Sequence, residues 1–291
     1  MFFFSLTRTL TSSKVLSLEI KNKRVCFVLY SLTRTFASNK NHETMKKFFI
    51  CLVAMMVAIC SYGQNEKTYE VDEFRTKNGK SVRFHALVHA SIRIEYDGKE
   101  IEVDPVSKLG NKTVDYSVMP KADVIFVTHE HGDHFDKEAI GLLNDKKTQV
   151  VTNQRCADML GYGKVMKNGD KLELTEDFSV EAVPAYNITE GRTQFHPKGR
   201  DNGYIITLDG LRIYIAGDTE DVPEMENVKD IDVAFLPCNQ PYTMTTEQLV
   251  KAAKVVKPKV LFPYHYGRTD VSGIPEQLKS EGIDVRIRHY E

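Results

Sequence analysis

The chain has no tryptophan and few cysteines. Five of its 291 residues are cysteine, and only Cys156 and Cys238 lie beyond residue 64. Neither stands in a C-x-x-C pattern, so the sequence offers no cysteine-based zinc or redox motif. Two cysteines in an exported chain can pair, but small buried apolar residues are the simpler interpretation of both.

Apolar runs long enough to cross a membrane are also lacking. The run Phe48–Cys60 is too short for a comfortable span. Two lysines precede it and small residues follow it, a pattern typical of a secretory signal peptide over 45–64. We therefore expect translation to start at Met45, residues 1–44 to be a non-native or disordered extension, and the mature protein to be periplasmic or secreted. The alternative is a signal anchor with a short cytoplasmic tail; no stable membrane span is expected in the mature chain.

An excess of positive charge is missing as well. Residues 1–64 hold nine of the 39 Lys and Arg residues and two of the 40 Asp and Glu residues. The remainder of the chain therefore carries 30 positive and 38 negative side chains, a net charge of −8. Binding to a phosphate backbone needs a basic surface, so this balance argues against a nucleic-acid substrate.

Beyond residue 80 the sequence predicts one mixed α/β domain. Residues 65–80 are polar and are predicted to be an N-terminal tail, which leaves 81–291 as a single domain of ordinary size. Short apolar runs separated by turn residues, such as Asp97-Gly98 and Asp209-Gly210, are typical of strands and hairpins. Helices are predicted at 137–144, 154–160, 246–256 and 275–280, and strands at 82–87, 92–96, 101–103, 124–127, 150–152, 171–174, 180–184, 203–208, 211–216, 233–236, 260–263 and 285–287.

One stretch combines a buried strand with a cluster of metal-ligand side chains. The apolar run 124–127 is followed closely by His129, His131, Asp133 and His134. His129 and His131 are two residues apart, so in extended backbone both project to the same side. A glycine before Asp133 permits a sharp turn, so three imidazoles and a carboxylate can share one space. Borderline divalent metals prefer these ligands. The alternative is a charged helix N-cap preceded by surface histidines.

The pattern H-x-H-x-D-H resembles the signature of the metallo-β-lactamase superfamily. Two later motifs match it in the same order, Gly217-Asp218 after one strand and His265 at the end of another. The resemblance implies an αββα sandwich, with two mixed sheets packed together and helices outside. It also implies two divalent metal ions, zinc being favoured over manganese or iron. One metal would take His129 and His131, the other Asp133, His134 and His265, and Asp218 would bridge them.

One position departs from that pattern. Well-studied members carry a histidine after the strand that corresponds to 180–183, and this chain has Asn187 there. An amide oxygen is a neutral, hard ligand that binds zinc more weakly than imidazole does. Three outcomes are open: Asn187 is a ligand, His196 takes its place, or the first metal site is labile. The segment 183–224 is similar to a branch of metal-dependent hydrolases related to L-ascorbate-6-phosphate lactonase and, more distantly, to N-acylphosphatidylethanolamine phospholipase D.

For two further residues, a role near the metal site follows only from the resemblance to the superfamily. It implies that Asp104 lies beneath the metal site and orients a histidine ligand; the alternative is a turn residue before a proline. His89, in a His-Ala-Ser segment after the first strand, either lines the pocket or is structural.

These residues predict a metal-dependent hydrolase. Water between two cations loses a proton near neutral pH, so a metal-bound hydroxide would attack an ester, lactone or phosphodiester of a small or lipid-like substrate. Asp133 can orient that hydroxide, and Tyr186 is the tyrosine expected to stabilise the oxyanion, with Tyr264 and Tyr266 as alternatives. Packing is the alternative role for all three tyrosines. The other functions considered are a mononuclear iron oxygenase of the same fold and a metal-binding protein without catalysis.

Overall fold

The computed structural model describes residues 17–20, 23–26 and 69–290. The chain divides into two units, residues 1–67 and 68–291. In the first, β1 (Ser17–Ile20) and β2 (Lys23–Cys26) form an antiparallel pair. The predicted signal peptide at 45–64 lies outside the described residues. Within the described ranges, none of the helices has the length and apolar character needed to cross a membrane.

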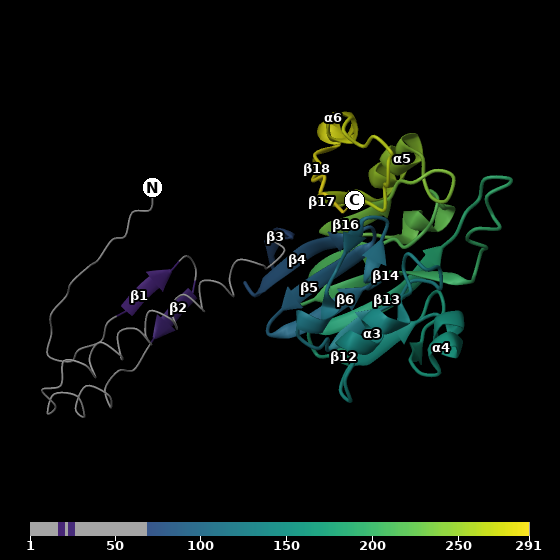
Figure 1. The fold of residues 1–291 in the computed structure, drawn as a ribbon. Coiled ribbons are helices and arrows are strands. Elements are labelled where there is room, and N and C mark those ends of the chain that lie inside the picture. Colours follow the sequence, from purple (N-terminus) through teal and green to yellow (C-terminus); the bar gives the residue numbers. More distant parts are fainter. Residues whose placement is uncertain (1–16, 21–22, 27–68, 291) are drawn as a thin grey trace, which may run out of the picture. The chain divides into compact units, whose positions relative to one another are not determined.

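The second unit is built on two seven-stranded mixed sheets (Figure 1). Sheet one has the order β11-β10-β9-β6-β5-β4-β3, with the bounds β3 (Glu70–Arg75), β4 (Ser81–Val88), β5 (Ser91–Tyr96), β6 (Lys99–Val103), β9 (Val124–Phe126), β10 (Gln149–Thr152) and β11 (Lys164–Val165). Sheet two runs in sequence order from β12 to β18, with the bounds β12 (Lys171–Thr175), β13 (Phe178–Ala185), β14 (Asp201–Leu208), β15 (Leu211–Ile215), β16 (Val233–Pro237), β17 (Val260–Tyr264) and β18 (Asp284–Val285). A small hairpin joins β7 (Lys108–Leu109) and β8 (Lys112–Thr113).

Along the central strands, successive apolar side chains point alternately to the inner and the outer face of the sheet, which explains why the two sheets pack face to face. In β9, Val124 and Phe126 lie in the core between the sheets, whereas Ile125 lies in the outer core of sheet one. In β16, Phe235 faces the inner core and Leu236 the outer core of sheet two. Successive side chains of a strand point to opposite faces, so an apolar run without polar residues belongs to a strand covered on both sides.

Helices cover the outer face of each sheet. On sheet one they are α3 (Lys137–Leu143), α4 (Gln154–Leu160) and the 3₁₀ turn η1 (Tyr116–Val118). On sheet two they are α5 (Thr246–Val256), α6 (Ile274–Leu278) and the 3₁₀ turn η2 (Pro223–Asn227), with η3 (Lys279–Glu281) after α6. Thr245 and Gln248 cap α5 reciprocally. The predicted αββα sandwich is confirmed, and Cys156 and Cys238 are both buried and unpaired, as the simpler interpretation predicted.

The largest difference from the predicted boundaries lies at the start of the domain. The polar tail predicted at 65–80 contains β3, the edge strand of sheet one. The inward-facing residue at the middle of β3 is Asp72, which is buried against Arg286 and Arg288 near the C-terminus. Because the buried position holds an aspartate, the strand lacks the apolar alternation by which strands are recognised.

Candidate metal centre

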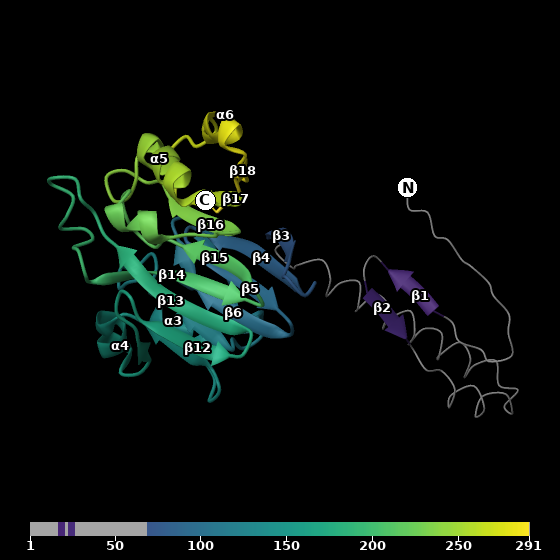
Figure 2. The ribbon, with the colours of Figure 1, turned by 180° about the vertical axis from the view of Figure 1, so that it is seen from behind.

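Strand ends from both sheets bring the candidate ligands to one edge of the sandwich. Residues 129–134 follow β9 of sheet one, whereas Asp218 and His265 follow β15 and β17 of sheet two. β15, β16 and β17 are parallel, so their carboxyl ends lie at the same edge. His196 comes from the loop between β13 and β14, which extends beyond the sheets (Figures 1 and 2). The structure thus brings together the predicted ligands His129 and His265, which are 136 positions apart in the chain.

The first ligand group consists of His129, His131 and His196, whose ring nitrogens lie within 4.8 Å of one another. His131 Nδ1 is 3.1 Å from His129 Nε2 and 3.2 Å from His196 Nε2. His129 and His196 are buried, and His131 is half-buried. Three imidazoles converging in this way can form one face of a tetrahedral metal site.

The second ligand group lies beside the first and shares Asp218 with it. Asp218 Oδ1 is 3.2 Å from His134 Nε2, and Asp218 Oδ2 is 3.2 Å from His265 Nε2 and 3.3 Å from His196 Nε2. Asp218 therefore contacts histidines of both groups, the position expected for a shared ligand. The remaining members of the second group, each offering an atom within 4.8 Å of the others, are His89, Asp133, His134 and His265.

A buried aspartate fixes which nitrogen of two ligands faces the centre. Asp104 Oδ2 accepts hydrogen bonds from His134 Nδ1 at 2.8 Å and from Thr128 Oγ1 at 2.7 Å. Because the Thr128 hydroxyl donates to Asp104, it accepts from His129 Nδ1 at 3.0 Å. In the neutral form of each ring the lone pair therefore lies on Nε2, the atom that faces the other ligands. Asp104 thus contacts a predicted ligand, His134, as the orienting role requires. Thr128, which sequence reasoning missed, links Asp104 to the second ring, that of His129.

His196 and Asn187 share one backbone acceptor. His196 Nδ1 donates to the Tyr242 carbonyl at 3.1 Å, and Asn187 Nδ2 donates to the same oxygen at 2.7 Å. The Asn187 backbone N–H also donates to the His196 carbonyl at 2.8 Å. His196, rather than Asn187, therefore places a nitrogen next to His129 and His131, while the Asn187 amide holds the segment that fixes the His196 tautomer. No sequence pattern could indicate the Tyr242 carbonyl, because a backbone oxygen carries no residue signal.

Several buried atoms of this centre make no hydrogen bond of good geometry among the described residues, including His134 Nε2, Asp218 Oδ1 and His265 Nε2. The two nitrogens lie 3.2 Å from Asp218 oxygens without such a bond. Buried polar atoms are otherwise almost always hydrogen-bonded. Imidazole nitrogens facing a carboxylate are the donor set that zinc, manganese and iron accept. The residues present therefore fit divalent cations.

Burial and nearby charge shift the histidine pKa values of the two groups in opposite directions. Burial lowers the pKa of His129, His131 and His196, that of His196 to about 4, so the first group is neutral and ready to act as ligands. Burial also opposes the charged forms of His134 and His265, but the Asp218 carboxylate outweighs it and raises both pKa values, that of His265 to about 9. His134 and His265 must therefore release protons when the second group binds a cation.

Asp133 and His89 lie at the outer side of the second group. The Asp133 side chain is 31% exposed, its Oδ2 is 3.2 Å from His89 Nε2 and 3.5 Å from His265 Nε2. Burial would raise the pKa of Asp133, but the charge of His134 and the contacts with His265 and His89 lower it below its ordinary value. The His89 ring packs on the His265 ring at a centroid distance of 3.7 Å. His89 thus lies within the second group of possible ligands, although its sequence context favoured a structural role.

The three candidate tyrosines have other contacts. The Tyr186 hydroxyl donates to Glu224 Oε2 at 2.7 Å and accepts from Lys198 Nζ at 3.1 Å. The Tyr264 hydroxyl accepts from the Gly217 N–H at 3.0 Å and so supports the loop that carries Asp218. The Tyr266 hydroxyl donates to the Arg288 carbonyl at 2.6 Å. The oxyanion-stabilising role of Tyr186 stays a prediction.

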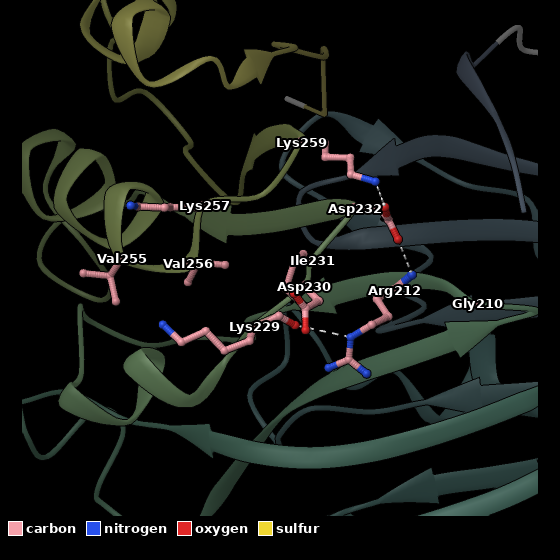
Figure 3. Close-up of a pocket in the computed structure, with 10 residues that line it drawn as sticks. All are labelled: Gly210, Arg212, Lys229, Asp230, Ile231, Asp232, Val255, Val256, Lys257 and Lys259. Atoms are coloured by element: carbon pink, nitrogen blue, oxygen red, sulfur yellow. Dashed lines mark hydrogen bonds and ion pairs between the residues drawn. The ribbon is translucent and has the colours of Figure 1, made fainter. Parts of the chain in front are cut away.

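A separate hollow of about 540 Å³ lies at the opposite end of the strands of sheet two (Figure 3). It is lined by residues that precede β16 and β17, including Asp232, which pairs with Lys259 at 2.7 Å. The metal-centre residues, by contrast, follow the carboxyl ends of β15 and β17. This hollow is therefore not part of the centre.

A four-layer αββα sandwich with histidines and aspartates gathered at one edge defines a metal-binding protein of the metallo-β-lactamase fold. A sequence profile described as "Beta-lactamase superfamily domain" matches residues 83–265. The chain is 33% identical over 204 residues to a "UPF0173 metal-dependent hydrolase" of Geobacillus thermodenitrificans, covering 66% of this chain and 89% of that protein. It is 32% identical over 212 residues to a protein of the same description from Pyrococcus abyssi, covering 68% and 91%.

Solved structures agree with this relationship. A crystal structure of a "putative metal-dependent hydrolase" from Parabacteroides distasonis has 51% identity and a TM-score of 0.74, covering 77% of this chain and all of that one. A metallo hydrolase from Ignicoccus hospitalis has 27% identity and a TM-score of 0.61, covering 71% and 94%. The chain belongs to the β-lactamase superfamily. The prediction of a metallo-β-lactamase-fold hydrolase is confirmed at this level, because the homologues are named metal-dependent hydrolases.

Proposed function

We propose that this protein is a dinuclear metal-dependent hydrolase of an ester, lactone or phosphodiester in a small or lipid-like substrate. The observation that carries the proposal is the position of Asp218 between two complete ligand groups, within 3.3 Å of histidine nitrogens in each. The names of the relatives support the reaction class.

The first cation would be held by His129, His131 and His196, and the second by Asp133, His134 and His265, with Asp218 shared. Divalent cations at such a site supply Lewis acidity and activate water near neutral pH, zinc being the favoured metal. His196 replaces the histidine that the superfamily pattern expects at position 187, which explains how the centre is completed despite Asn187.

The protein's own groups supply orientation and proton transfer. Asp133 is the carboxylate on the outer side of the centre, and its lowered pKa keeps it ionised, so it can accept the proton of an attacking water. His89 Nε2 lies within hydrogen-bond distance of Asp133 Oδ2 and helps to position that carboxylate. Asp104 and Thr128 keep two ligand rings in one tautomer, so that little reorganisation is needed when the substrate binds.

Metal content and turnover test the proposal together. Chelation should abolish hydrolysis of bis(p-nitrophenyl) phosphate, a lactone or an aryl ester, and zinc or manganese should restore it with about two cations per chain. About one metal per chain without turnover on any substrate would instead favour a non-catalytic metal-binding protein. Iron retained after anaerobic purification, with oxygen uptake, would favour the oxygenase.

Two substitutions test the role of His196. His196→Ala should lose one cation per chain and at least about tenfold in turnover, because it removes a ligand of the first group. Asn187→Ala should keep both cations, since the Asn187 amide donates to the Tyr242 and Arg192 carbonyls and is not counted among the ligands. Loss of a cation in Asn187→Ala but not in His196→Ala would reverse the two roles.

Export to the periplasm or the medium is also part of the proposal, and the pattern at 45–64 supports it. N-terminal sequencing of the mature protein from an expressing cell should begin near residue 65; an intact N-terminus on cytoplasmic protein would contradict it.

A further inference from the structure

An exposed apolar surface adjoins the first ligand group. Tyr242 and Ile188 are 46% and 45% exposed, two of the few large apolar side chains at the surface of the described chain. The half-buried Phe195 ring packs edge-on against the Tyr242 ring at a centroid distance of 5.1 Å. We call Ile188, Phe195 and Tyr242 the apolar surface.

This surface is attached to the metal centre through backbone contacts. Phe195 directly precedes His196, and the carbonyl of Tyr242 accepts from His196 Nδ1. Ile188 directly follows Asn187, whose amide donates to that same carbonyl. His196 in turn lies 3.2 Å from His131, a half-buried member of the centre. The segments that carry these apolar side chains are therefore joined to the centre on the side of His131, its half-buried histidine.

The lysine and arginines of the loop that carries Ile188 and Phe195 are paired with carboxylates. Lys198 binds Glu224 at 2.7 Å, Arg200 binds Asp201 at 2.7 Å, and Arg192 lies 3.5 Å from Glu220. These are all the lysines and arginines of the loop between β13 and β14. Recognition of a phosphate or carboxylate needs cationic groups that are not neutralised by a neighbouring carboxylate. The loop therefore favours an uncharged apolar group over an anionic one.

We infer that the apolar surface binds the acyl or aryl part of the substrate, and that the enzyme acts on an uncharged carboxylic ester or lactone carrying an apolar chain. This inference rests on the proposed function and narrows its substrate class. Burying one methylene contributes about 0.8 kcal/mol, which corresponds to roughly fourfold in kcat/KM. A surface that stays half open to solvent should contribute about half of that free energy per methylene. Specificity should consequently rise with chain length.

Hydrolysis of p-nitrophenyl esters from acetate to octanoate by the zinc-loaded protein tests the inference. The kcat/KM value should rise by about twofold per methylene over several carbons and exceed that for bis(p-nitrophenyl) phosphate. In Tyr242→Ala the octanoate value should fall about tenfold and the acetate value less than threefold, because only the longer chain reaches the ring. Tyr162→Ala is the matched control, since Tyr162 is 43% exposed on the segment between α4 and β11.

A binding measurement separates this inference from the proposed function. The natural chain has no tryptophan, so Tyr242→Trp creates a single fluorescent reporter on the apolar surface. Neutral octanamide should change its emission saturably, whereas butanamide should bind at least about tenfold more weakly and Tyr162→Trp should not respond. Ester turnover without chain-length dependence, or equal behaviour of the 242 and 162 variants, would overturn the inference while leaving the hydrolase intact. Octanamide binding without turnover on any substrate would sustain the apolar site and refute the proposed reaction.

Discussion

Asp104 Oδ2 accepts a hydrogen bond from His134 Nδ1 at 2.8 Å, and both side chains are fully buried. The same carboxylate accepts from the backbone and the hydroxyl of Thr128. One residue at the end of β6 therefore orients ligands that follow β9. Partners of this kind govern metal affinity although they do not touch the metal.

Replacing this carboxylate by an amide should weaken the metal centre. Asp104 has a left-handed backbone (φ 44°), which asparagine tolerates, so Asp104→Asn keeps the local conformation. The asparagine amide replaces one carboxylate oxygen, which accepts hydrogen bonds, by an NH₂ group, which donates them. Zinc affinity should therefore fall about 10- to 100-fold in a chelator competition assay. Asp123→Asn is the control, because Asp123 accepts only a backbone N–H from Glu100. Equal affinities in the two variants would contradict the orienting role.

His89→Asn should act on the second ligand group alone. His89 also has a left-handed backbone (φ 57°), and the substitution removes the contacts of its ring with Asp133 and His265. We expect turnover to fall at least about tenfold and the second equivalent of cobalt or zinc to bind more weakly, with the first equivalent unchanged. The control is His85→Asn, since His85 pairs with Glu95 on the sheet. A variant that binds both equivalents normally and retains turnover would rule out a role for His89.

The convergence of most candidate ligands could be predicted from the sequence, because all of them except His196 follow an apolar strand. His129, Asp218 and His265 come after β9, β15 and β17, so periodicity and motif order together predict that they meet. The choice between Asn187 and His196 could not be predicted, because it depends on the path of a loop that has no periodicity. β3 was missed for a different reason, namely that its buried residue, Asp72, is charged.

Metal binding should depend on pH in the second group more than in the first. Burial lowers and the Asp218 carboxylate raises the pKa of His265, with a net rise from 6.5 to about 9, so a cation must displace its proton below pH 9. His196, with a pKa of about 4, needs no deprotonation at neutral pH. Affinity for the second cation should rise by about tenfold or more per pH unit between pH 6.5 and 9, and calorimetry in buffers of different ionisation enthalpy should show proton release.

The same raised pKa makes a prediction for the metal-free protein. A histidine with a raised pKa in the folded state stabilises the fold fully below pH 6.5 and loses that contribution as pH rises through 9. The Tm of the chelated protein should therefore fall over this range, and saturating zinc should remove most of the slope. A flat Tm profile without metal would show that His265 is not charged in the folded protein.

Asp72 is expected to hold the C-terminal segment on sheet one. Its carboxylate binds Arg288 through two bonds of 2.7 Å and Arg286 through one of 2.9 Å. The carbonyl of the buried Tyr290, two residues beyond Arg288, accepts from the His89 N–H at 3.0 Å. Both guanidinium groups remain partly exposed, so Asp72→Asn should lower the free energy of unfolding by about 1–2 kcal/mol. That corresponds to a fall in Tm of about 2–8 °C for a domain of this size. Glu73→Gln, at an exposed neighbouring position, should change stability by less than about 0.5 kcal/mol in the same denaturant titration. If the two variants were equally stable, the ion pairs at Asp72 would not be what secures the C-terminal segment.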